Sequence, residues 1–369
     1  MNREDDKQEA SSVIHTVDIS TQLTSFAYEE LQRELGAPPD LTAWSTNAYA
    51  ASGLTRVTIY RITSQRFTGY FLRVSMNPHH VLRQSTDPMA LFDPSDFAEL
   101  IPAFDGLLQS GTDVSLPSLP YWLACRIDYA VDAVVGNSPT RPSADRYIDL
   151  ARRGFLPIGA NDQTRTGWIS FKAGNKSGSV QLYHRGPALR SRFTGLAEDV
   201  YQQADRLLRL EVQCKTGRLA SLARKHRFPD RTLQHFMTTP HIGHDELARQ
   251  CQRIFGSFGF VSYRKASAQI NRNAELQRRT KADILNLLKA VEVAGGIVAA
   301  QEKWLQGTPI SLHFAKQRRS VQFSNEQVPR LLRRLDQLSL HLVVVPAAWR
   351  MGVVEHPFPA FADQCSDTP

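Results

Sequence analysis

The fold of this chain is decided by two segments, Cys125-Arg-Ile-Asp-Tyr-Ala-Val-Asp132 and Leu207-Leu-Arg-Leu-Glu-Val-Gln-Cys-Lys215. In both segments apolar and polar side chains alternate, which is the pattern of a β-strand with one face in the core. The pattern predicts a sheet with a packed back and a polar front. On that front the first strand places Arg126, Asp128 and Asp132, and the second places Arg209, Glu211 and Gln213.

The carboxylates of this front are suited to a divalent cation. Asp128 and Glu211 lie on separate strands, and carboxylate oxygens are the ligands that Mg²⁺ and Mn²⁺ prefer. Asp132 shares the face of Asp128, as a third ligand or as a residue that supports the other two. Arg126 beside them is suited to holding a phosphate. Taken alone, each residue fits a structural salt bridge better, so only the combination indicates a site.

The length, hydrophobic content and net charge of the chain limit the classes of protein to which it can belong. The chain has 369 residues, 42% of them hydrophobic, and a formal net charge of +8. This length predicts two domains, and the basic excess favours an anionic partner such as nucleic acid or a membrane surface. No apolar stretch is long enough to cross a bilayer, and the polar start MNREDDKQEASS does not resemble a signal peptide. We therefore expect a cytoplasmic protein with no membrane partner.

Several common sites are excluded by spacing. The four cysteines are far apart and form no CxxC pair, which argues against a zinc ribbon and a disulfide framework. No two histidines stand at i and i+2, and His241-Ile-Gly-His244 lacks the partners that a zinc site needs. The chain also has no Walker loop, no GxGxxG and no GxSxG motif.

Alternation, periodicity and turn residues predict an α+β protein. The predicted strands are 13–19, 54–62, 67–75, 121–135, 168–172, 179–184 and 207–215, and the predicted helices are 26–35, 94–108, 144–154 and 196–205. After Lys215 the chain becomes helical and basic, which places a boundary near residue 225. The predicted organisation is a disordered tail 1–12, a mixed domain 13–225, a mostly helical domain 226–346 and a loose tail 347–369.

The helical part and the end of the last strand are rich in basic residues. Such a run fits a DNA-binding surface, although a solvated helical face would look the same. The candidate DNA contacts are Lys215, Arg218, Arg224, Lys225, Arg264, Lys265, Arg278 and Arg279.

A tyrosine nucleophile is the second candidate for chemistry. Tyr183 ends the strand Ser179-Val-Gln-Leu-Tyr183, and Arg185 follows two residues later. A tyrosine hydroxyl is a weak nucleophile, so it needs a phosphate that is polarised by a cation or by an arginine such as Arg185. Packing is the common role of a tyrosine at a strand end. Tyr147 and Tyr201, both in predicted helices, are the weaker candidates.

The order of these segments resembles the replication initiators of filamentous phages and related rolling-circle plasmids, the gene II protein and RstA-like group. The resemblance rests on Val13-Ile-His-Thr-Val17, Phe71-Leu-Arg-Val-Ser-Met-Asn-Pro78, Arg126-Ile-Asp128, Tyr183-His-Arg185 and Arg209-Leu-Glu-Val212, and it covers roughly residues 13–220. The family has Asp and Lys after the tyrosine, where this chain has His184 and Arg185. The difference affects a metal-ligand or phosphate contact that the family makes directly after the tyrosine.

The resemblance implies a nicking endonuclease whose sheet has helices packed on its back. The predicted fold is therefore an antiparallel-rich sheet with helices packed on one face, followed by the smaller, mostly helical domain. Such an enzyme cuts one strand of an origin, single-stranded or hairpin, and joins its tyrosine to the 5′ phosphate with the help of Mg²⁺ or Mn²⁺. The 3′ hydroxyl then primes a host polymerase in the bacterial cytoplasm, and a host helicase is a further possible partner. The family implies Tyr183 as nucleophile, Arg126 and Arg185 as phosphate contacts, and Asp128 and Glu211, with Asp132, as metal ligands.

Two other functions fit parts of the same sequence. A non-catalytic DNA-binding initiator or regulator would need the basic region and would leave the acidic front structural. A tyrosine recombinase also combines Arg, His and Tyr, but it needs its tyrosine near the C-terminus, and the chain has no tyrosine after Gln301. We therefore expect a nicking initiator, with the non-catalytic initiator as the alternative.

Overall fold

The computed structural model describes residues 13–65, 67–85, 87–156, 163–167, 169–314 and 317–362. The predicted disordered tail 1–12, Trp168 and the last residues 363–369 lie outside this part. The described chain forms two compact units: the first contains residues 13–131, 174–180 and 211–247, and the second contains 132–173, 181–210 and 248–362. The sequence predicts a single boundary near residue 225, whereas the structure divides the chain at several points.

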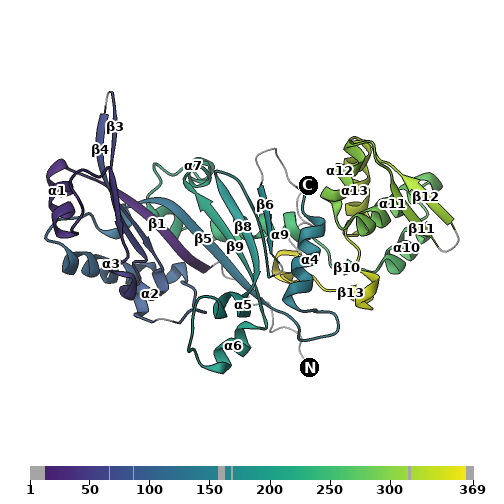
Figure 1. The fold of residues 1–369 in the computed structure, drawn as a ribbon, viewed down its shortest axis with the longest axis horizontal. Coiled ribbons are helices and arrows are strands. Elements are labelled where there is room, and N and C mark those ends of the chain that lie inside the picture. Colours follow the sequence, from purple (N-terminus) through teal and green to yellow (C-terminus); the bar gives the residue numbers. More distant parts are fainter. Residues whose placement is uncertain are drawn as a thin grey trace. The chain divides into compact units, whose positions relative to one another are not determined.

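The largest sheet confirms the predicted α+β class (Figure 1). Its nine described strands follow the order β2-β3-β4-β1-β5-β9-β8-β7-β6. The pairs β2–β3, β3–β4, β4–β1 and β1–β5 are all antiparallel. The strands are β1 (Val13–Leu23), β2 (Ala43–Thr46), β3 (Arg56–Ser64), β4 (Phe67–Met76), β5 (Leu123–Val134), β6 (Gln163–Gly167), β7 (Ser170–Gly174), β8 (Gly178–His184) and β9 (Leu207–Lys215).

Alternation along the strands gives the first unit an apolar back. Val17 on β1 lies opposite Met76 on β4 and Ile127 on β5, and all three side chains are fully buried. Burying such side chains contributes about 1.5–3 kcal/mol each, so this layer fixes the register of the strands. The predicted packed back is confirmed.

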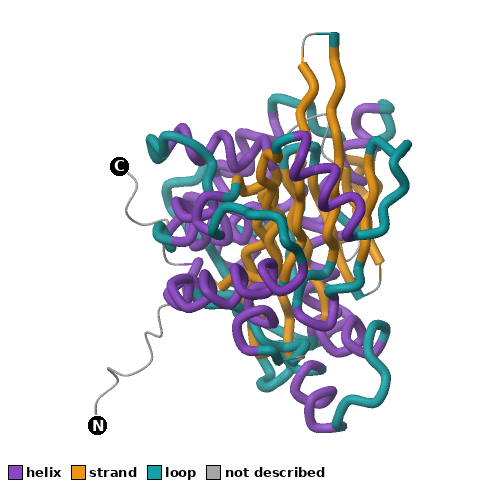
Figure 2. The backbone as a smooth tube through the Cα atoms, turned by 90° about the vertical axis from the view of Figure 1, so that its left-hand side faces the viewer, coloured by secondary structure: helices purple, strands orange, loops and turns teal. Residues whose placement is uncertain are grey.

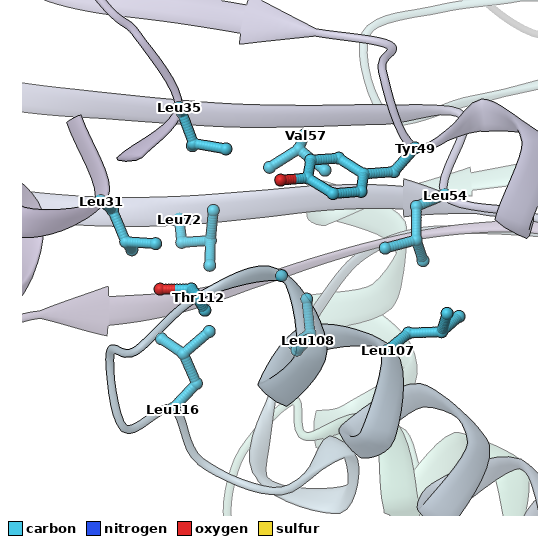
Figure 3. Close-up of a pocket in the computed structure, with 11 residues that line it drawn as sticks. Leu31, Leu35, Tyr49, Leu54, Val57, Leu72, Leu107, Leu108, Thr112 and Leu116 are labelled. Atoms are coloured by element: carbon cyan, nitrogen blue, oxygen red, sulfur yellow. The ribbon is translucent and has the colours of Figure 1, made fainter. Parts of the chain in front are cut away.

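Two helices of the first unit, α1 (Ser25–Glu34) and α3 (Phe97–Gly111), pack on that back. A small apolar cavity shows the arrangement, because Leu31 from α1, Leu72 from β4 and Leu108 from α3 line it together (Figure 3). The ring of Tyr28 on α1 also lies 4.9 Å from that of Tyr70 on β4. The helices of the first unit are α1 (Ser25–Glu34), α2 (Pro78–Arg83), α3 (Phe97–Gly111), α7 (Thr216–Lys225) and α8 (Leu233–Met237), followed by the start of α9 (His241–Phe255).

The predicted glycine-rich hairpin joins β7 to β8. Its turn is closed by the amide of Asn175, which donates to the carbonyl of Gly178 over 2.8 Å. A Cβ on Gly178 would stand 2.7 Å from the carbonyl oxygen of Gln213, closer than atoms can approach. Only glycine therefore lets the hairpin lie this close to β9.

The second unit combines the far strand ends with most of the later helices. Its elements include α4 (Ala144–Gly154), α5 (Arg185–Arg190), α6 (Glu198–Ala204), α10 (Tyr263–Arg272), α11 (Arg278–Ala294), α12 (Ile297–Leu305) and α13 (Gln327–Gln337), the hairpin of β11 (Ile310–Phe314) and β12 (Gln317–Val321), and the short pair β10 (Phe260–Val261) with β13 (Val353–Val354). Helix α4 begins at Ala144 after Ser143, as predicted. Within the described ranges, every helix is too short or too polar to cross a lipid bilayer.

Residues 347–362 are more ordered than predicted. Residues 347–362 were expected to be loose, but β13 pairs with β10, and α14 (Pro359–Ala362) follows it. The rings of Phe358 and Phe361 are buried. The guanidinium of Arg141 also bonds the carboxylate of Glu355 over 2.9 Å. The prediction of a loose tail is therefore wrong for 347–362, because apolar side chains near the end supply core contacts.

A buried ion pair in the second unit leads to a stability prediction. The guanidinium of Arg209, which is fully buried, bonds both carboxylate oxygens of Asp132 over 2.7 and 2.6 Å. Asp132→Ala should lower the free energy of unfolding by roughly 3 to 5 kcal/mol, because it leaves a buried cation without this carboxylate. Urea unfolding measures the loss.

The matched control is Asp149→Ala, because Asp149 pairs with partly exposed Arg153 on the same helix over 2.7 Å. An exposed i,i+4 pair contributes only about 0.3–0.5 kcal/mol. Equal losses for both variants would contradict a special role for the Asp132–Arg209 pair.

Candidate active site on the polar front of the sheet

Charged side chains gather on the front of the first unit, on four neighbouring strands in the order β4-β1-β5-β9. This front cluster consists of His15 and Asp18 on β1, Arg73 on β4, Arg126 and Asp128 on β5, and Glu211 on β9. Asp18 and Arg126 are direct cross-strand partners in the register of β1 and β5. The sequence predicted Arg126, Asp128 and Glu211 at this place, and the structure adds the other three.

Asp128 is the most deeply buried carboxylate of the front cluster. Its side chain is fully buried, and Arg126 binds both of its oxygens, with 2.8 Å between Nε and Oδ1. Burial raises the pKa of Asp128 to about 6; Arg126 opposes this rise and the charge of Glu211 adds to it. Burial would also lower the pKa of Arg126, but the hydrogen bond and charge of Asp128 outweigh it and raise that pKa.

This shifted pKa gives stability a dependence on pH. Because the folded protein binds the proton of Asp128 more tightly than the unfolded chain, the proton stabilises the fold below about pH 4, and that stability is lost as the pH rises through about 6. At 1.36 kcal/mol per pKa unit, the loss is roughly 3 kcal/mol. Asp128→Asn should remove this pH-dependent loss. The free energy of unfolding, measured with urea at several pH values between 4 and 7, should therefore fall less steeply with pH in the variant than in the natural protein. Parallel pH profiles would contradict this assignment.

His15 and Glu211 form a second pair beside Asp128. The Nδ1 atom of His15 lies 3.4 Å from Oε2 of Glu211, and the two side chains are 20% and 13% exposed. Both residues act electrostatically on Asp128, so the three side chains share one environment. Glu211 is thus close enough to Asp128 to raise its pKa. That the two carboxylates share one metal ion stays a prediction.

Asp18 completes the front cluster, and the described residues supply a hydrogen bond to only one of its two carboxylate oxygens. Its Oδ2 accepts a hydrogen bond of 2.6 Å from Arg73. Its Oδ1 is buried and has no hydrogen-bond partner among the described residues. A buried acceptor of this kind costs free energy unless a water, a cation or a donor of a ligand fills the place.

The donor set fits a hard divalent cation only in part, because the Glu211 carboxylate is a hard oxygen ligand whereas the His15 imidazole is a ligand that Mg²⁺ does not favour. Within the described ranges, no group of three or more His, Cys, Asp or Glu residues lies close enough to hold a metal by itself. Mg²⁺ keeps several waters and is commonly bound by one or two carboxylates plus substrate phosphates, so a full protein cage is not required. Glu211 and His15 are the accessible ligands, and both act electrostatically on buried Asp128.

Other predicted site residues are held in structural contacts of the second unit. Asp132 is engaged by Arg209, as described above. Tyr183 is the second-last residue of β8, with 5% of its surface exposed, and Arg185 begins α5 with 3% exposed. Burial, together with the charge of Arg209, lowers the pKa of Arg185, and the charge of Tyr183 opposes this shift.

His184 stands where the resembled family has Asp, and both of its ring nitrogens have contacts. The Nδ1 atom of His184 lies 3.1 Å from the carboxylate of Asp145, and its Nε2 donates to the carbonyl of Asp205 over 2.9 Å. The weaker nucleophile candidates have backbone partners, because Tyr147 donates to the carbonyl of Glu355 and Tyr201 to that of Phe193, each over 2.9 Å. The polar atoms of His184, Tyr147 and Tyr201 are thus engaged within the second unit.

The predicted DNA-binding residues differ in availability. Arg218 is not free for a phosphate, because its guanidinium binds buried Glu246, with 3.0 Å between Nε and Oε2. Lys225 lies 3.7 Å from Asp245 in an exposed pair, and Lys215 is half-buried. The fully exposed candidates are Arg224 at the end of α7, Arg264 and Lys265 at the start of α10, and Arg278 and Arg279 at the start of α11.

Three residues of the front cluster are absent from the sequence prediction: His15, Asp18 and Arg73. A signal for two of them was present, since Asp18 and Arg73 stand at polar positions of alternating strands. His15 was hidden by an irregularity of β1, whose pairing with β5 shifts between Ile14 and Thr16.

No family model, curated protein or solved structure matches this chain. The geometry of the front cluster must therefore carry the functional argument.

Proposed function

We propose that this chain starts rolling-circle replication by nicking one strand of an origin, with the front cluster as its cation and phosphate site. The observation that carries the proposal is the meeting of His15, Glu211 and Asp128 on three neighbouring strands, beside Arg126. A bound Mg²⁺ or Mn²⁺ supplies positive charge that stabilises the phosphate oxygens during displacement.

The chain's own residues have separate tasks in this proposal. Glu211 and His15 hold the cation, and buried Asp128 keeps Arg126 in place. Arg126 and Arg73, whose side chains are 31% and 41% exposed, contact the phosphate. Tyr183 is the proposed nucleophile. Its hydroxyl gives up its proton to solvent as the oxygen bonds to phosphorus, the bond to the 3′ oxygen breaks, and the 3′ oxygen takes up a proton from solvent to leave as a hydroxyl.

The proposed reaction gives the DNA product a defined use. The 5′ phosphate stays on the tyrosine, and the free 3′ hydroxyl primes a host polymerase, with a host helicase as a further proposed partner. This chemistry takes place in the bacterial cytoplasm, where both partners act. Arg185 is proposed to steady the phosphotyrosine, since it lies two residues from Tyr183.

A specific observation favours the non-catalytic alternative. Tyr183 is 95% buried, so nicking requires its side chain to become available. A DNA-binding initiator without chemistry does not require this change.

A nicking assay separates the two functions. The substrate is supercoiled DNA that carries the chain's own gene with its flanking sequence, incubated with Mg²⁺ or Mn²⁺ and, as control, with EDTA. We expect open circles with a defined 5′ end in the presence of cation only. Binding without nicks under every cation condition would leave the non-catalytic initiator.

The exposed basic residues make a prediction that both functions share. Reversing the charges of Arg278 and Arg279 to Glu should weaken binding similarly for all DNA sequences, because phosphate contacts carry no sequence information. The slope of log K against log salt should become shallower by about 2, since two counterions fewer are released. Arg33→Glu on α1, an exposed charge reversal in the other unit, is the control. An unchanged slope would exclude the start of α11 as a DNA contact.

A further inference from the structure

The β3–β4 hairpin extends beyond its neighbouring strands as a two-stranded ribbon (Figures 1 and 2). Its pairing is regular up to Ser64 and Phe67, so each residue has a defined face. Cross-strand partners point to the same side of an antiparallel pair. Tyr60 with Phe71, and Thr58 with Arg73, therefore share one face.

This face of the hairpin is continuous with the polar front of the sheet. The opposite face carries Val57 and Leu72, which are buried in the apolar back. Arg73 belongs to the front, because it binds Asp18 of the front cluster over 2.6 Å. The hairpin thus leads directly to the front cluster within the first unit.

Aromatic rings cover the front of the hairpin. The rings of Tyr60 and Phe71 stack, with centroids 5.2 Å apart and an interplanar angle of 17°. The ring of Phe67 lies over Gly69, because a Cβ there would stand 2.4 Å from Cζ of Phe67 and 2.9 Å from Phe71. Gly69 therefore leaves room for the two phenylalanine rings to approach each other. The aromatic strip consists of Phe67, Phe71 and Tyr60.

The aromatic strip is accessible, and the hairpin that carries it is basic. Phe67 is 50% exposed, Ile62 beside it is 49% exposed, and Tyr60 and Phe71 are half-buried. The segment 56–76 contains four arginines and no Asp or Glu, and two of them, Arg56 and Arg73, lie on the face of the aromatic strip. A core-forming patch would not need this charge, whereas an anionic partner with flat rings would match both properties.

We propose that the aromatic strip is a stacking platform that binds single-stranded DNA and leads it toward the front cluster. Bases stack on aromatic side chains, and arginines hold the backbone between them. Paired bases are hidden inside a duplex, so this contact selects an unpaired strand. The inference rests on the proposed function for what happens to the strand next, but the binding itself does not require nicking.

The test measures binding without cation, so that no strand is cut. Anisotropy of a labelled 15-nucleotide oligo-dT in EDTA should show affinity about 10-fold lower for Phe67→Ala and for Phe71→Ala. Tyr60→Phe should bind like the natural protein, because the ring is kept. Phe67→Leu should lose affinity like Phe67→Ala, since an apolar side chain without a flat ring cannot stack. Phe26→Ala, which removes an exposed aromatic ring on α1, is the matched control and should bind normally.

A second readout reports stacking directly. Oligo-dT should quench the tryptophan emission of Phe67→Trp more than it quenches the emission of the natural protein. A blunt duplex of equal length should not cause this additional quenching. Thermal melting confirms that each variant is folded.

The outcomes separate this inference from the proposed function. Lower oligo-dT affinity of the Ala and Leu variants supports the platform, even if the natural protein never nicks DNA. Unchanged affinity in all variants, or an equal loss for duplex, would overturn it. An equal loss with Phe26→Ala would also overturn it, because the effect would then not belong to this face.

Discussion

Glu211→Gln is expected to lower the rate of nicking by about 10³-fold while single-stranded DNA binding stays within about twofold. Glutamine keeps the size of the side chain but removes the charge that holds the cation, and such charge stabilisation commonly contributes this much to a rate. His15→Gln and Asp128→Asn should act in the same direction, since both residues share the environment of Glu211. Initial rates on supercoiled DNA across a Mg²⁺ titration measure the effect.

Gln213→Ala is the matched control for this experiment. Gln213 lies two residues further along β9 and is half-buried like Glu211, but its side chain is uncharged. It should nick normally. If Glu211→Gln nicks at the natural rate, the front cluster is not the cation site.

Tyr183→Phe is expected to bind DNA normally and to form no covalent adduct. The ring of Tyr183 is 95% buried, so phenylalanine keeps its packing while removing the only atom that can attack phosphorus. Denaturing gels with end-labelled nicked DNA detect the adduct, and peptide mapping locates it in the natural protein.

Tyr147→Phe and Tyr201→Phe serve as controls, because each removes one hydrogen bond to a backbone carbonyl. Each should cost about 1 kcal/mol of stability and leave the adduct intact. An adduct in Tyr183→Phe would exclude this nucleophile, and mapping would then identify the true one.

Much of the sheet follows from the sequence, because strand alternation is a local signal. The two faces of β5 and β9, the β3–β4 hairpin and the turn before Gly178 are all where their patterns predict them. Helix α4 begins where Ser143 indicates. These features depend on neighbours within a few residues, so one sequence is enough to specify them.

The partners of the charged residues are harder to predict. Arg126 and Asp128 stand two residues apart on one strand, so their mutual pairing could have been foreseen from alternation alone. The pair of Asp132 with Arg209 joins strands that are far apart in sequence, and its partner depends on the order of β5 and β9. Strand order is a non-local property that alternation does not specify.

His15 shows how a single irregularity defeats a face assignment. Strict alternation from Val17 places His15 on the apolar back. The register shift between Ile14 and Thr16 acts as a bulge, so Ile14 is buried and His15 reaches Glu211 instead. The pairing of His15 with Glu211 in the front cluster therefore depends on this one bulge.

The most direct test of the account locates the cation itself. Fe²⁺ takes the place of Mg²⁺ in many sites, and with ascorbate and peroxide it cuts the peptide chain near where it is bound. The account predicts cuts close to residues 15, 128 and 211, which are suppressed by excess Mg²⁺ and lost in Glu211→Gln. Cuts that fall elsewhere, or that persist unchanged in Glu211→Gln, would contradict a cation site at the front cluster.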